Sequence, residues 1–226
     1  MSETYKTTRA EVQTYFDQIA STTWEQLTSD APVSRIRQTV REGRDTMRRL
    51  LLDALPADLT GARVFDAGCG TGQAANELAA RGAEVLAVDI SPSLLHVARR
   101  RTAPALASRI DFRAGDMLDP DFGRFDHVIA MDSLIHYRPE DSARALSALR
   151  ERTRGKLVFT VAPKTPLLTL MHWSGKVLPR SNRSPAIVPA SFRRLSGELA
   201  AHGWSLHRLG RVQRGFYISD AMELRP

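Results

Sequence analysis

The chain has 226 residues, of which 42% are hydrophobic and 25% charged. This length and composition predict one globular domain with some decoration, and they exclude a disordered chain. The single cysteine, Cys69, excludes an internal disulfide. Residues 1–9 are too polar for a secretory signal, and no apolar run reaches the roughly 18 residues that span a bilayer. We therefore expect a soluble, cytoplasmic protein.

Positive charge is concentrated toward the C-terminus. The net charge is +7, yet residues 136–226 carry 16 Lys and Arg against 6 Asp and Glu, whereas residues 1–135 are slightly acidic. A localised positive field favours an anionic partner: a carboxylated or phosphorylated substrate, an acidic protein, an anionic membrane surface or a nucleic acid. The alternative is a solvated basic surface in an arginine-rich protein.

Residues 1–60 predict a helical extension. Apolar residues recur at helical spacing within 9–56. Residues 30–33 interrupt the pattern, Ser34 is a plausible N-cap for the second helix, and Pro56 ends it.

Residues 61–162 predict strands that alternate with helices. The expected strands span residues 63–67, 84–89, 109–113, 125–131 and 156–162. The expected helices span residues 73–81, 92–101 and 140–150. This alternation is typical of an α/β fold with a doubly wound parallel sheet.

The remaining residues predict an insertion followed by a helix and a hairpin. Five prolines punctuate residues 163–190, an apolar and basic segment that we interpret as a lid or binding loop. A helix is expected at 191–201, and an antiparallel hairpin at 204–213 and 216–222. The sheet would then have seven strands, and residues 61–226 would form one domain with 163–190 inserted.

A glycine-rich turn joins the first predicted strand to the following helix. Gly68, Gly70 and Gly72 are spaced G-x-G-x-G, whereas the dinucleotide fingerprint G-x-G-x-x-G would need a glycine where Gln73 stands. Asp66 comes two residues before the turn. A carboxylate there suits a ligand with an ammonium group better than a pyrophosphate.

Two more carboxylates follow the next two predicted strands. Asp89 is placed to bind ribose hydroxyls, and Asp116 to accept a hydrogen bond from an exocyclic amine. An ammonium, a ribose and an adenine amine together describe S-adenosyl-L-methionine. The alternatives for a glycine-rich turn of this kind are an NAD enzyme or a fortuitous turn.

These motifs, in this order, resemble the Rossmann-like S-adenosylmethionine-dependent methyltransferases. The likeness covers about residues 61–162 and includes the segment Phe125–Asp132. It implies that the first motif binds the amino-acid part of the cofactor, Asp89 the ribose, and Asp116 with Met117 the adenine. We read Cys69 as a small packed residue, not a catalytic thiol. The implied cofactor-binding residues are Asp66, Gly68, Cys69, Gly70, Gly72, Asp89, Ile90, Asp116, Met117 and Met131.

The chain beyond the cofactor motifs resembles a narrower family, the magnesium-protoporphyrin IX O-methyltransferases of (bacterio)chlorophyll biosynthesis. The likeness lies in Met131–Tyr137, Tyr15–Asp17 with Trp24, Arg41–Arg44, and Phe216–Ser219. It implies methyl transfer to a propionate of magnesium protoporphyrin IX, with magnesium present only as part of the substrate. That family commonly has a tyrosine where this chain has Thr28, so any role of that tyrosine is in doubt here.

A propionate acceptor implies functional roles for a few side chains. It is ionised at neutral pH and needs no general base, so positioning and exclusion of water are the main tasks. His136 is our candidate for orienting the acceptor carboxylate, and a structural histidine that caps the next helix is the alternative. Tyr15 and Phe16 are candidates to close the cofactor pocket, or else core residues. The substrate-binding candidates are Tyr137, His172, Trp173, Arg180 and Arg183.

The same residues are compatible with other partners and reactions. A quinone-pathway phenol as acceptor would make His136 an essential base. The basic C-terminal region also suggests an RNA methyltransferase, although we expect no nucleic-acid partner, and a non-catalytic porphyrin carrier is disfavoured by the three intact acids. No protein-bound metal is expected. The resemblance implies that the porphyrin comes from the large porphyrin-binding subunit of magnesium chelatase, and the apolar, basic insertion permits contact with the photosynthetic membrane.

Overall fold

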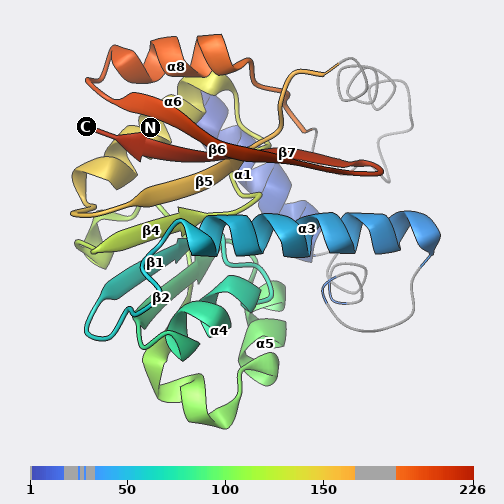
Figure 1. The fold of residues 1–226 in the computed structure, drawn as a ribbon, viewed down its shortest axis with the longest axis vertical. Helices are drawn as coiled ribbons and strands as arrows, with labels where there is room; N and C mark the ends of the chain where they lie inside the picture. Colours follow the sequence, from blue (N-terminus) through green and yellow to red (C-terminus); the bar gives the residue numbers. More distant parts are fainter. Residues whose placement is uncertain (1, 18–24, 26–27, 29–33, 166–186) are drawn as a thin grey trace.

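The computed structural model describes residues 2–17, 25, 28, 34–165 and 187–226 (Figure 1). Most of the predicted lid therefore lies outside the described residues. The same holds for the candidates His172, Trp173, Arg180 and Arg183.

A seven-stranded mixed sheet forms the centre of the molecule, in the order β3-β2-β1-β4-β5-β7-β6 (Figure 1). The strands β1 to β5 are parallel, and β7 runs antiparallel between β5 and β6. The strands are β1 (Arg63–Ala67), β2 (Glu84–Asp89), β3 (Ile110–Ala114), β4 (His127–Ala130), β5 (Leu157–Val161), β6 (Ser205–Arg214) and β7 (Tyr217–Arg225). The predicted fold class is thus confirmed, including the antiparallel C-terminal hairpin.

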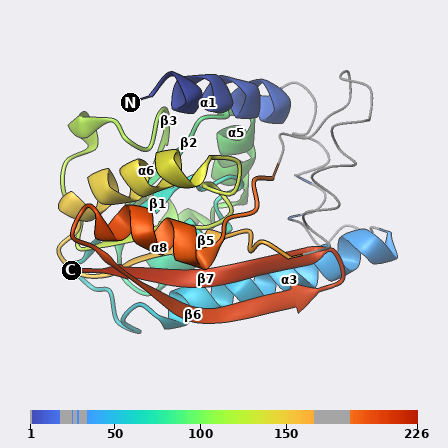
Figure 2. The same ribbon diagram turned by 90° about the horizontal axis from the view of Figure 1, so that it is seen from above.

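Helices cover both faces of the sheet. They are α1 (Glu3–Tyr15), α3 (Arg35–Asp53), α4 (Gln73–Ala80), α5 (Pro92–Arg101), α6 (Pro139–Glu151) and α8 (Phe192–Ala200). Apolar side chains of α3, α4 and α5 share one core with the sheet, and those of α1, α6 and α8 share the other. Figure 2 shows α1 and α3 on opposite sides of the sheet.

The central strands separate these two cores because successive side chains of a strand point to opposite faces. Val64 of β1 belongs to the core beneath α3, whereas its neighbour Phe65 belongs to the core beneath α6. Phe65 stacks on Phe125 with 4.5 Å between ring centroids. Both faces of β1 are thus buried, as is typical of a parallel sheet covered by helices on both sides.

The first helix begins earlier than predicted, at Glu3 instead of near residue 9. Ser2 caps it, since the backbone N–H of Tyr5 donates to the Ser2 hydroxyl at 3.1 Å. Within the helix only Tyr5 and Val12 are buried, so its periodic apolar signal is weak. The other predicted elements agree with the structure to within about three residues.

The two ends of the predicted insertion lie side by side. Pro163 and Ala190 form an isolated parallel bridge, and the Ala190 N–H donates to the Ala162 carbonyl at 2.8 Å. The Val188 N–H donates to the carbonyl of Ile135 at 2.8 Å. The chain therefore returns from this insertion beside the turn that follows β4. Among the helices described here, none is long and apolar enough to cross a membrane.

Candidate active site

A cavity of about 940 Å³, including its part open to solvent, lies at the carboxyl ends of β1, β2, β3 and β4. Ligands bind at this edge of open parallel sheets, at the point where the strand order reverses. Side chains of α1 and α3 complete the lining. Eleven of the predicted site residues line it: Asp66, Gly68, Cys69, Gly70, Asp89, Ile90, Asp116, Met117, Met131, His136 and Tyr137.

The glycine turn has a left-handed backbone at all three of its glycines. Gly68, Gly70 and Gly72 have φ angles of 86°, 54° and 77°. A Cβ atom at position 68 would lie 2.3 Å from the Cβ of Ser133, so only glycine fits between the turn and the segment after β4. Gly72 is the N-cap of α4 and is outside the cavity lining as described.

Asp66 carries a buried carboxylate at the floor of the cavity. Among the described residues no hydrogen-bond partner reaches its Oδ2 atom. Burial, with a smaller contribution from the nearby Asp89 carboxylate, raises the pKa of Asp66 to about 7. A buried carboxylate oxygen with an unmet hydrogen bond is costly unless a ligand supplies the donor. This arrangement fits the ammonium group expected from the sequence.

Asp89 anchors the turn and still faces the cavity. Its Oδ2 accepts from the Gly70 N–H at 2.8 Å and its Oδ1 from the Ser91 N–H at 2.9 Å. Burial raises the pKa of Asp89 to about 6, although these backbone hydrogen bonds oppose the shift. Each carboxylate oxygen has a second acceptor site, so both are compatible with a ribose hydroxyl as a further donor.

Asp116 reaches the cavity but is also bound by α1. Its Oδ1 accepts from the hydroxyl of Tyr5 at 2.8 Å, and its Oδ2 from the guanidinium of Arg9 at 2.6 Å. Neither partner could be predicted from the sequence, because both are more than 100 residues away and no motif marks them. An adenine amine would have to share this carboxylate with α1.

Tyr137 lies against α1 at the same end of the cavity. Its ring stacks on that of Tyr5, with 4.8 Å between centroids and 24° between the ring planes. Burial raises the pKa of both phenols above the ordinary value. Both hydroxyl groups therefore remain protonated and can donate hydrogen bonds at neutral pH.

His136 lines the cavity just after β4, as predicted. The ring of Phe16 meets it edge to face at 6.4 Å between centroids, so Phe16 closes the cavity on this side, whereas Tyr15 is outside the lining as described. The N-cap of α6 is Arg138. His136 therefore does not occupy the capping position that the structural alternative requires.

Cys69 is buried in the turn and packs in the core shared by α3, α4 and α5. Burial raises the pKa of its thiol well above the ordinary value. A thiol in this environment stays protonated, which agrees with a packing role.

The structure adds residues that sequence reasoning did not single out. Arg44 and Arg48 of α3 line the cavity, as do Asp132 and Ser133 after β4. Thr28 is outside the lining as described; its hydroxyl accepts from the Arg101 guanidinium at 2.9 Å. No group of three or more His, Cys, Asp or Glu side chains that could hold a metal occurs within the described part of the chain.

One relative covers the whole chain. The magnesium-protoporphyrin O-methyltransferase of Rhodobacter capsulatus is 52% identical over 227 residues, which is 100% of both chains. This chain belongs to the magnesium-protoporphyrin O-methyltransferase family. The model for the magnesium-protoporphyrin IX methyltransferase C-terminus matches residues 130–226, and a general methyltransferase-domain model matches residues 64–155.

Solved structures agree with this family assignment. The Synechocystis PCC 6803 magnesium protoporphyrin IX methyltransferase, crystallised with bound SAH, is 27% identical and superposes with a TM-score of 0.79 over 95% of this chain and 98% of its own. A ubiquinone biosynthesis O-methyltransferase of Xanthomonas oryzae pv. oryzae is 37% identical, but over only 48% of this chain and 46% of its own. The resemblance seen in the sequence is thus confirmed at full length for the magnesium-protoporphyrin family.

Proposed function

We propose that this protein transfers the methyl group of S-adenosyl-L-methionine to a propionate carboxylate of magnesium protoporphyrin IX. The product is the monomethyl ester of (bacterio)chlorophyll biosynthesis. One observation carries the proposal: a full-length relative at 52% identity bears this activity in its name. The Asp66 Oδ2 atom at the glycine turn supports it, because no side chain or backbone group in the described part of the chain binds this atom and it fits the cofactor's amino group.

The cofactor would be held along the cavity by three carboxylates. Asp66 would bind its ammonium group and Asp89 its ribose hydroxyls. Asp116 and Met117 would lie against the adenine, with Asp116 also bound to Tyr5 and Arg9 of α1. When bound, this cofactor supplies an electrophilic methyl group on a sulfonium. The protein's own task is then to align the acceptor and exclude water, and good alignment alone can lower such barriers by about 7–11 kcal/mol.

His136 would orient the acceptor carboxylate. The carboxylate is already ionised, so the imidazole need not take a proton and acts by donating a hydrogen bond. The return of the insertion at Val188 contacts Ile135, the residue before His136. This supports an insertion whose residues His172, Trp173, Arg180 and Arg183 bind the substrate on the His136 side of the site. Tyr137, the fifth proposed substrate-binding residue, stacks on Tyr5 near Asp116.

Three further assignments concern the N-terminal extension, a partner protein, which the resemblance alone implies, and the membrane. Residues 1–60 would act as a cover for cofactor and substrate, and the contacts of α1 with Asp116 support this. The porphyrin would be received from the large porphyrin-binding subunit of magnesium chelatase. The apolar and basic composition of the insertion supports peripheral contact with the photosynthetic membrane.

A labelling assay tests the reaction. The purified full-length protein is incubated with methyl-labelled S-adenosylmethionine and magnesium protoporphyrin IX, and the pigments are separated and weighed by mass spectrometry. We expect one labelled methyl group per porphyrin, released by mild alkali as an ester should be. Label that appears in a quinone-pathway phenol or in RNA, offered in parallel, but not in the porphyrin would refute the proposal.

A further inference from the structure

Two cavities outside the candidate active site meet where the chain enters and leaves the insertion. One, of about 630 Å³ including its part open to solvent, lies between the start of α8 and the strands β5, β6 and β7. The other, of about 770 Å³ measured in the same way, lies between the starts of α6 and α8. Lys164 and Ser191 line both cavities. We call the two cavities together the neck groove.

Backbone hydrogen bonds fix the two chain segments at the centre of the neck groove. The Lys164 N–H donates to the Ala190 carbonyl at 3.1 Å, and the Ala190 N–H donates to the Ala162 carbonyl at 2.8 Å. Behind them, the Val188 N–H is bound to the Ile135 carbonyl. The neck groove is therefore a preformed part of the fold, which lowers the entropic cost of binding a partner.

Positive charge is in excess around the neck groove. Five lysine and arginine side chains line it, against two carboxylates: Arg138, Lys164, Arg194, Arg208 and Arg211 against Glu140 and Asp220. Both carboxylates are already paired, Glu140 with Arg194, and Asp220 with two arginines of β6. No carboxylate among the described residues forms an ion pair with Arg138 or Lys164. These cations are left for a partner.

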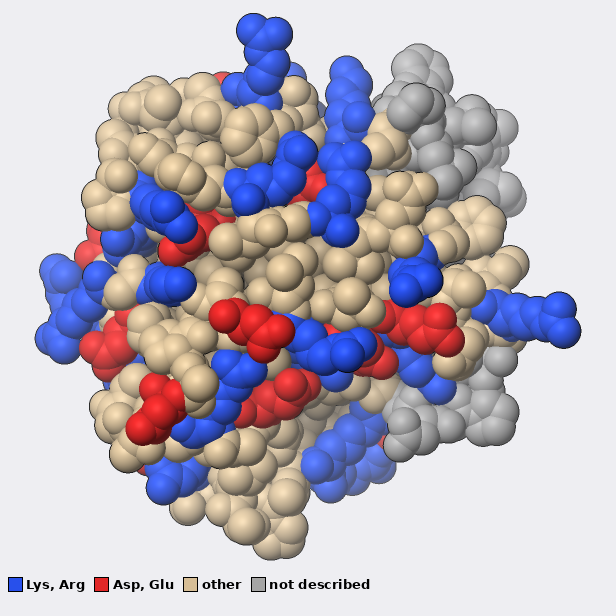
Figure 3. Space-filling model, viewed as in Figure 1, with Lys and Arg blue, Asp and Glu red and all other residues tan. Residues whose placement is uncertain are grey.

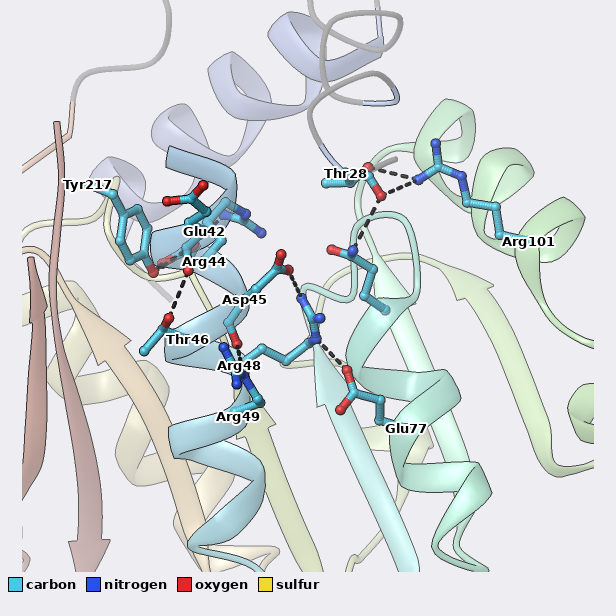
Figure 4. A network of polar contacts seen from close by, with 12 residues as sticks. Thr28, Glu42, Arg44, Asp45, Thr46, Arg48, Arg49, Glu77, Arg101 and Tyr217 are labelled. Carbon is cyan, nitrogen blue, oxygen red and sulfur yellow. Dashed lines mark hydrogen bonds and ion pairs between the residues drawn. The ribbon is translucent and has the colours of Figure 1, made fainter. Parts of the chain in front are cut away.

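Two other regions of the molecule lack this excess. On α3, Arg48 donates both to Asp45 and to Glu77 of α4 (Figure 4). A cavity at the amino ends of β1, β2 and β3 has two arginines and two acids in its lining. The unpaired charge of the neck groove is therefore not a general property of this arginine-rich surface.

Two of the cations in the neck groove are held in fixed positions. Asp220 is 2% exposed, and Arg211 donates to its two carboxylate oxygens at 2.5 and 2.9 Å. The Arg208 Nε lies 3.3 Å from the same carboxylate, and its guanidinium lies 5.3 Å from the centre of the Phe192 ring. Both arginine side chains stay partly exposed. Because a guanidinium has five N–H donors in a planar fork, each can bind a further carboxylate.

The cavity beside α8 has an apolar floor. It is formed by four buried side chains, Val161, Leu195, Leu206 and Met222. Phe192 lies in the same lining and is one of the exposed large hydrophobic residues. A concave apolar floor surrounded by arginines fits an apolar side chain that has carboxylates on either side of it.

The neighbouring chain offers few acids that could neutralise this groove. From Lys164 to Arg214 the sequence contains one acidic residue, Glu198, and the insertion between the two neck segments adds further lysine and arginine. Figure 3 shows basic side chains with few acidic ones near α8 and β6. The complementary negative charge is therefore best supplied by another molecule.

We propose that the neck groove docks an acidic segment of a partner protein. Its carboxylates bind Arg138, Lys164 and the two arginines of β6, and an apolar side chain enters the cavity beside Phe192. A bilayer surface does not fill a concave floor, whereas a peptide segment places single side chains in such cavities. Docking here brings the partner next to Ile135, the residue before His136. This inference goes beyond methyl transfer and does not depend on it.

Fluorescence anisotropy with the full-length protein tests the docking site. The probe is a fluorescein-labelled, glutamate-rich peptide with a leucine and a phenylalanine at its centre. One matched peptide has glutamine for every glutamate, and another has alanine for the leucine and the phenylalanine. We expect the probe to bind with an affinity that falls as salt increases. The glutamine peptide should not bind measurably, and the alanine peptide should bind at least about fivefold more weakly.

Charge reversal locates the bound peptide. Lys164→Glu and Arg138→Glu change exposed cations that have no ion pair among the described residues, and each should weaken probe binding about tenfold. Arg49→Glu makes the same change at an exposed position of α3 (Figure 4), and should leave the affinity within about twofold. The cores beneath α3 and α8 lie on opposite faces of the sheet, so this control is remote from the groove.

The apolar contact is tested separately by Phe192→Ala. This variant should weaken binding of the probe and leave binding of the alanine peptide unchanged, since the two changes remove the same contact. Circular dichroism of each variant confirms that it is folded before titration.

Several results would overturn the proposal. They include no binding of the probe, an equal loss with Arg49→Glu, and equal binding of the probe and the alanine peptide. Vesicles of phosphatidylcholine with phosphatidylglycerol, or a single-stranded RNA, that lose binding in Lys164→Glu when the probe does not would assign the groove to a lipid surface or a nucleic acid. A raised KM for magnesium protoporphyrin with unchanged probe binding would assign it to the substrate. The titrations contain neither cofactor nor porphyrin, so their failure leaves the proposed function standing.

Discussion

At the scale of single residues, Asp66 has the environment that departs most from that of an ordinary surface carboxylate. Its pKa is raised to about 7, yet the ammonium of a bound cofactor requires its ionised form. Binding must therefore release a proton from Asp66 at pH values below about 7. The α-amino group of the ligand has its own pKa near about 8 and must keep its proton.

This linkage predicts a pH dependence of cofactor affinity. We expect the affinity for S-adenosylhomocysteine to rise as the pH increases from 5.5 to about 7.5 and to fall again above about 8.5. Calorimetry at pH 6 in two buffers of different ionisation enthalpy measures the released protons directly. Affinity that stays flat across this range, with no proton release, would show that Asp66 does not meet the ammonium.

The raised pKa of Asp66 also predicts that its ionised carboxylate lowers the stability of the ligand-free protein while it supports cofactor binding. Because the folded-state pKa of Asp66 exceeds the ordinary 3.8, the folded chain binds more protons than the unfolded chain between the two values. The stability contribution is therefore complete below about pH 4 and is lost as the pH rises through about 7. Asp66→Asn should raise the free energy of unfolding of the ligand-free protein at pH 8, on the order of 2 kcal/mol, and abolish measurable cofactor binding.

Thermal unfolding of both proteins at pH 5 and pH 8 checks this prediction. The advantage of the Asn variant should be small at pH 5 and larger at pH 8. The same difference in melting temperature at both pH values would mean that Asp66 does not titrate in this range.

His136 is expected to act on the acceptor and not on the cofactor. His136→Ala should lower kcat by about 10²-fold or more, the loss seen when one preorganised hydrogen-bond donor is removed from an active site, and leave S-adenosylhomocysteine affinity within about twofold. The matched control is His127→Asn, because His127 lies at the start of β4, where its Nδ1 accepts from the Lys156 N–H at 3.0 Å. Steady-state kinetics of both variants are compared. Unchanged turnover of His136→Ala would assign this histidine a structural role.

The site residues that the sequence predicts differ from those that it does not in where they lie along the chain. Asp66, the glycines and Asp89 follow from sequence because they lie next to one another, or at the ends of adjacent strands. Arg44 and Tyr5 come from helices whose rotation is set by tertiary packing. The spacing of residues within these helices does not indicate that Arg44 contacts Asp132 or that Tyr5 contacts Asp116. These contacts follow only from the positions of the helices in the fold.

At the scale of elements, α1 closes the cavity through polar contacts at both its ends. Near its start, the Thr4 hydroxyl donates to Asp141 of α6 at 2.7 Å, and Ser2 also donates to this carboxylate. Just past its end, Asp17 accepts from the Ser91 hydroxyl at 2.6 Å. Because α1 buries few apolar side chains, these contacts should determine how firmly it covers the site.

Loosening α1 at a position away from the cavity tests this role. Asp141→Asn weakens the attachment to Ser2 and Thr4 without altering a residue of the described cavity lining. We expect cofactor KM to rise about three- to tenfold, trypsin to cleave at Lys6 or Arg9 more rapidly, and kcat at saturation to persist. Unchanged KM together with unchanged proteolysis would show that these contacts do not hold the cover.

Element boundaries followed from local signals where such signals are strong. Helix α5 begins at Pro92 with Ser91 as its N-cap, as the residues predicted, because the hydroxyl of Ser91 accepts from the Leu94 N–H. The start of α1 was missed because two buried residues in thirteen do not make a readable apolar stripe. Its position depends on contacts with residues 91, 116 and 141, which no local window contains.

At the scale of the whole molecule, the C-terminal hairpin supports a residue of the cavity lining, Asp132. Strand β7 inserts antiparallel between β5 and β6 and thereby places Tyr217 beside Asp132. The hairpin and its direction were predicted from the sequence. The contact between Tyr217 of this hairpin and Asp132 was not predicted, because strand order within a sheet is a long-range property.

Charge is also organised at this scale. On the face shown in Figure 3, basic side chains stand among few acidic ones in the upper part, near α8 and β6, whereas both signs alternate along α3. The upper part belongs to residues 136–226, which carry a net charge of +10. A positive field of this kind suits the approach of a substrate with two propionates.

The most direct test of this account is a crystal structure of the full-length protein with S-adenosylhomocysteine. We predict the amino group within hydrogen-bond distance of Asp66 Oδ2, the ribose hydroxyls at Asp89, and the adenine beside Asp116 and Met117. A ligand bound elsewhere, or an amino group that leaves Asp66 Oδ2 without a partner, would contradict the account.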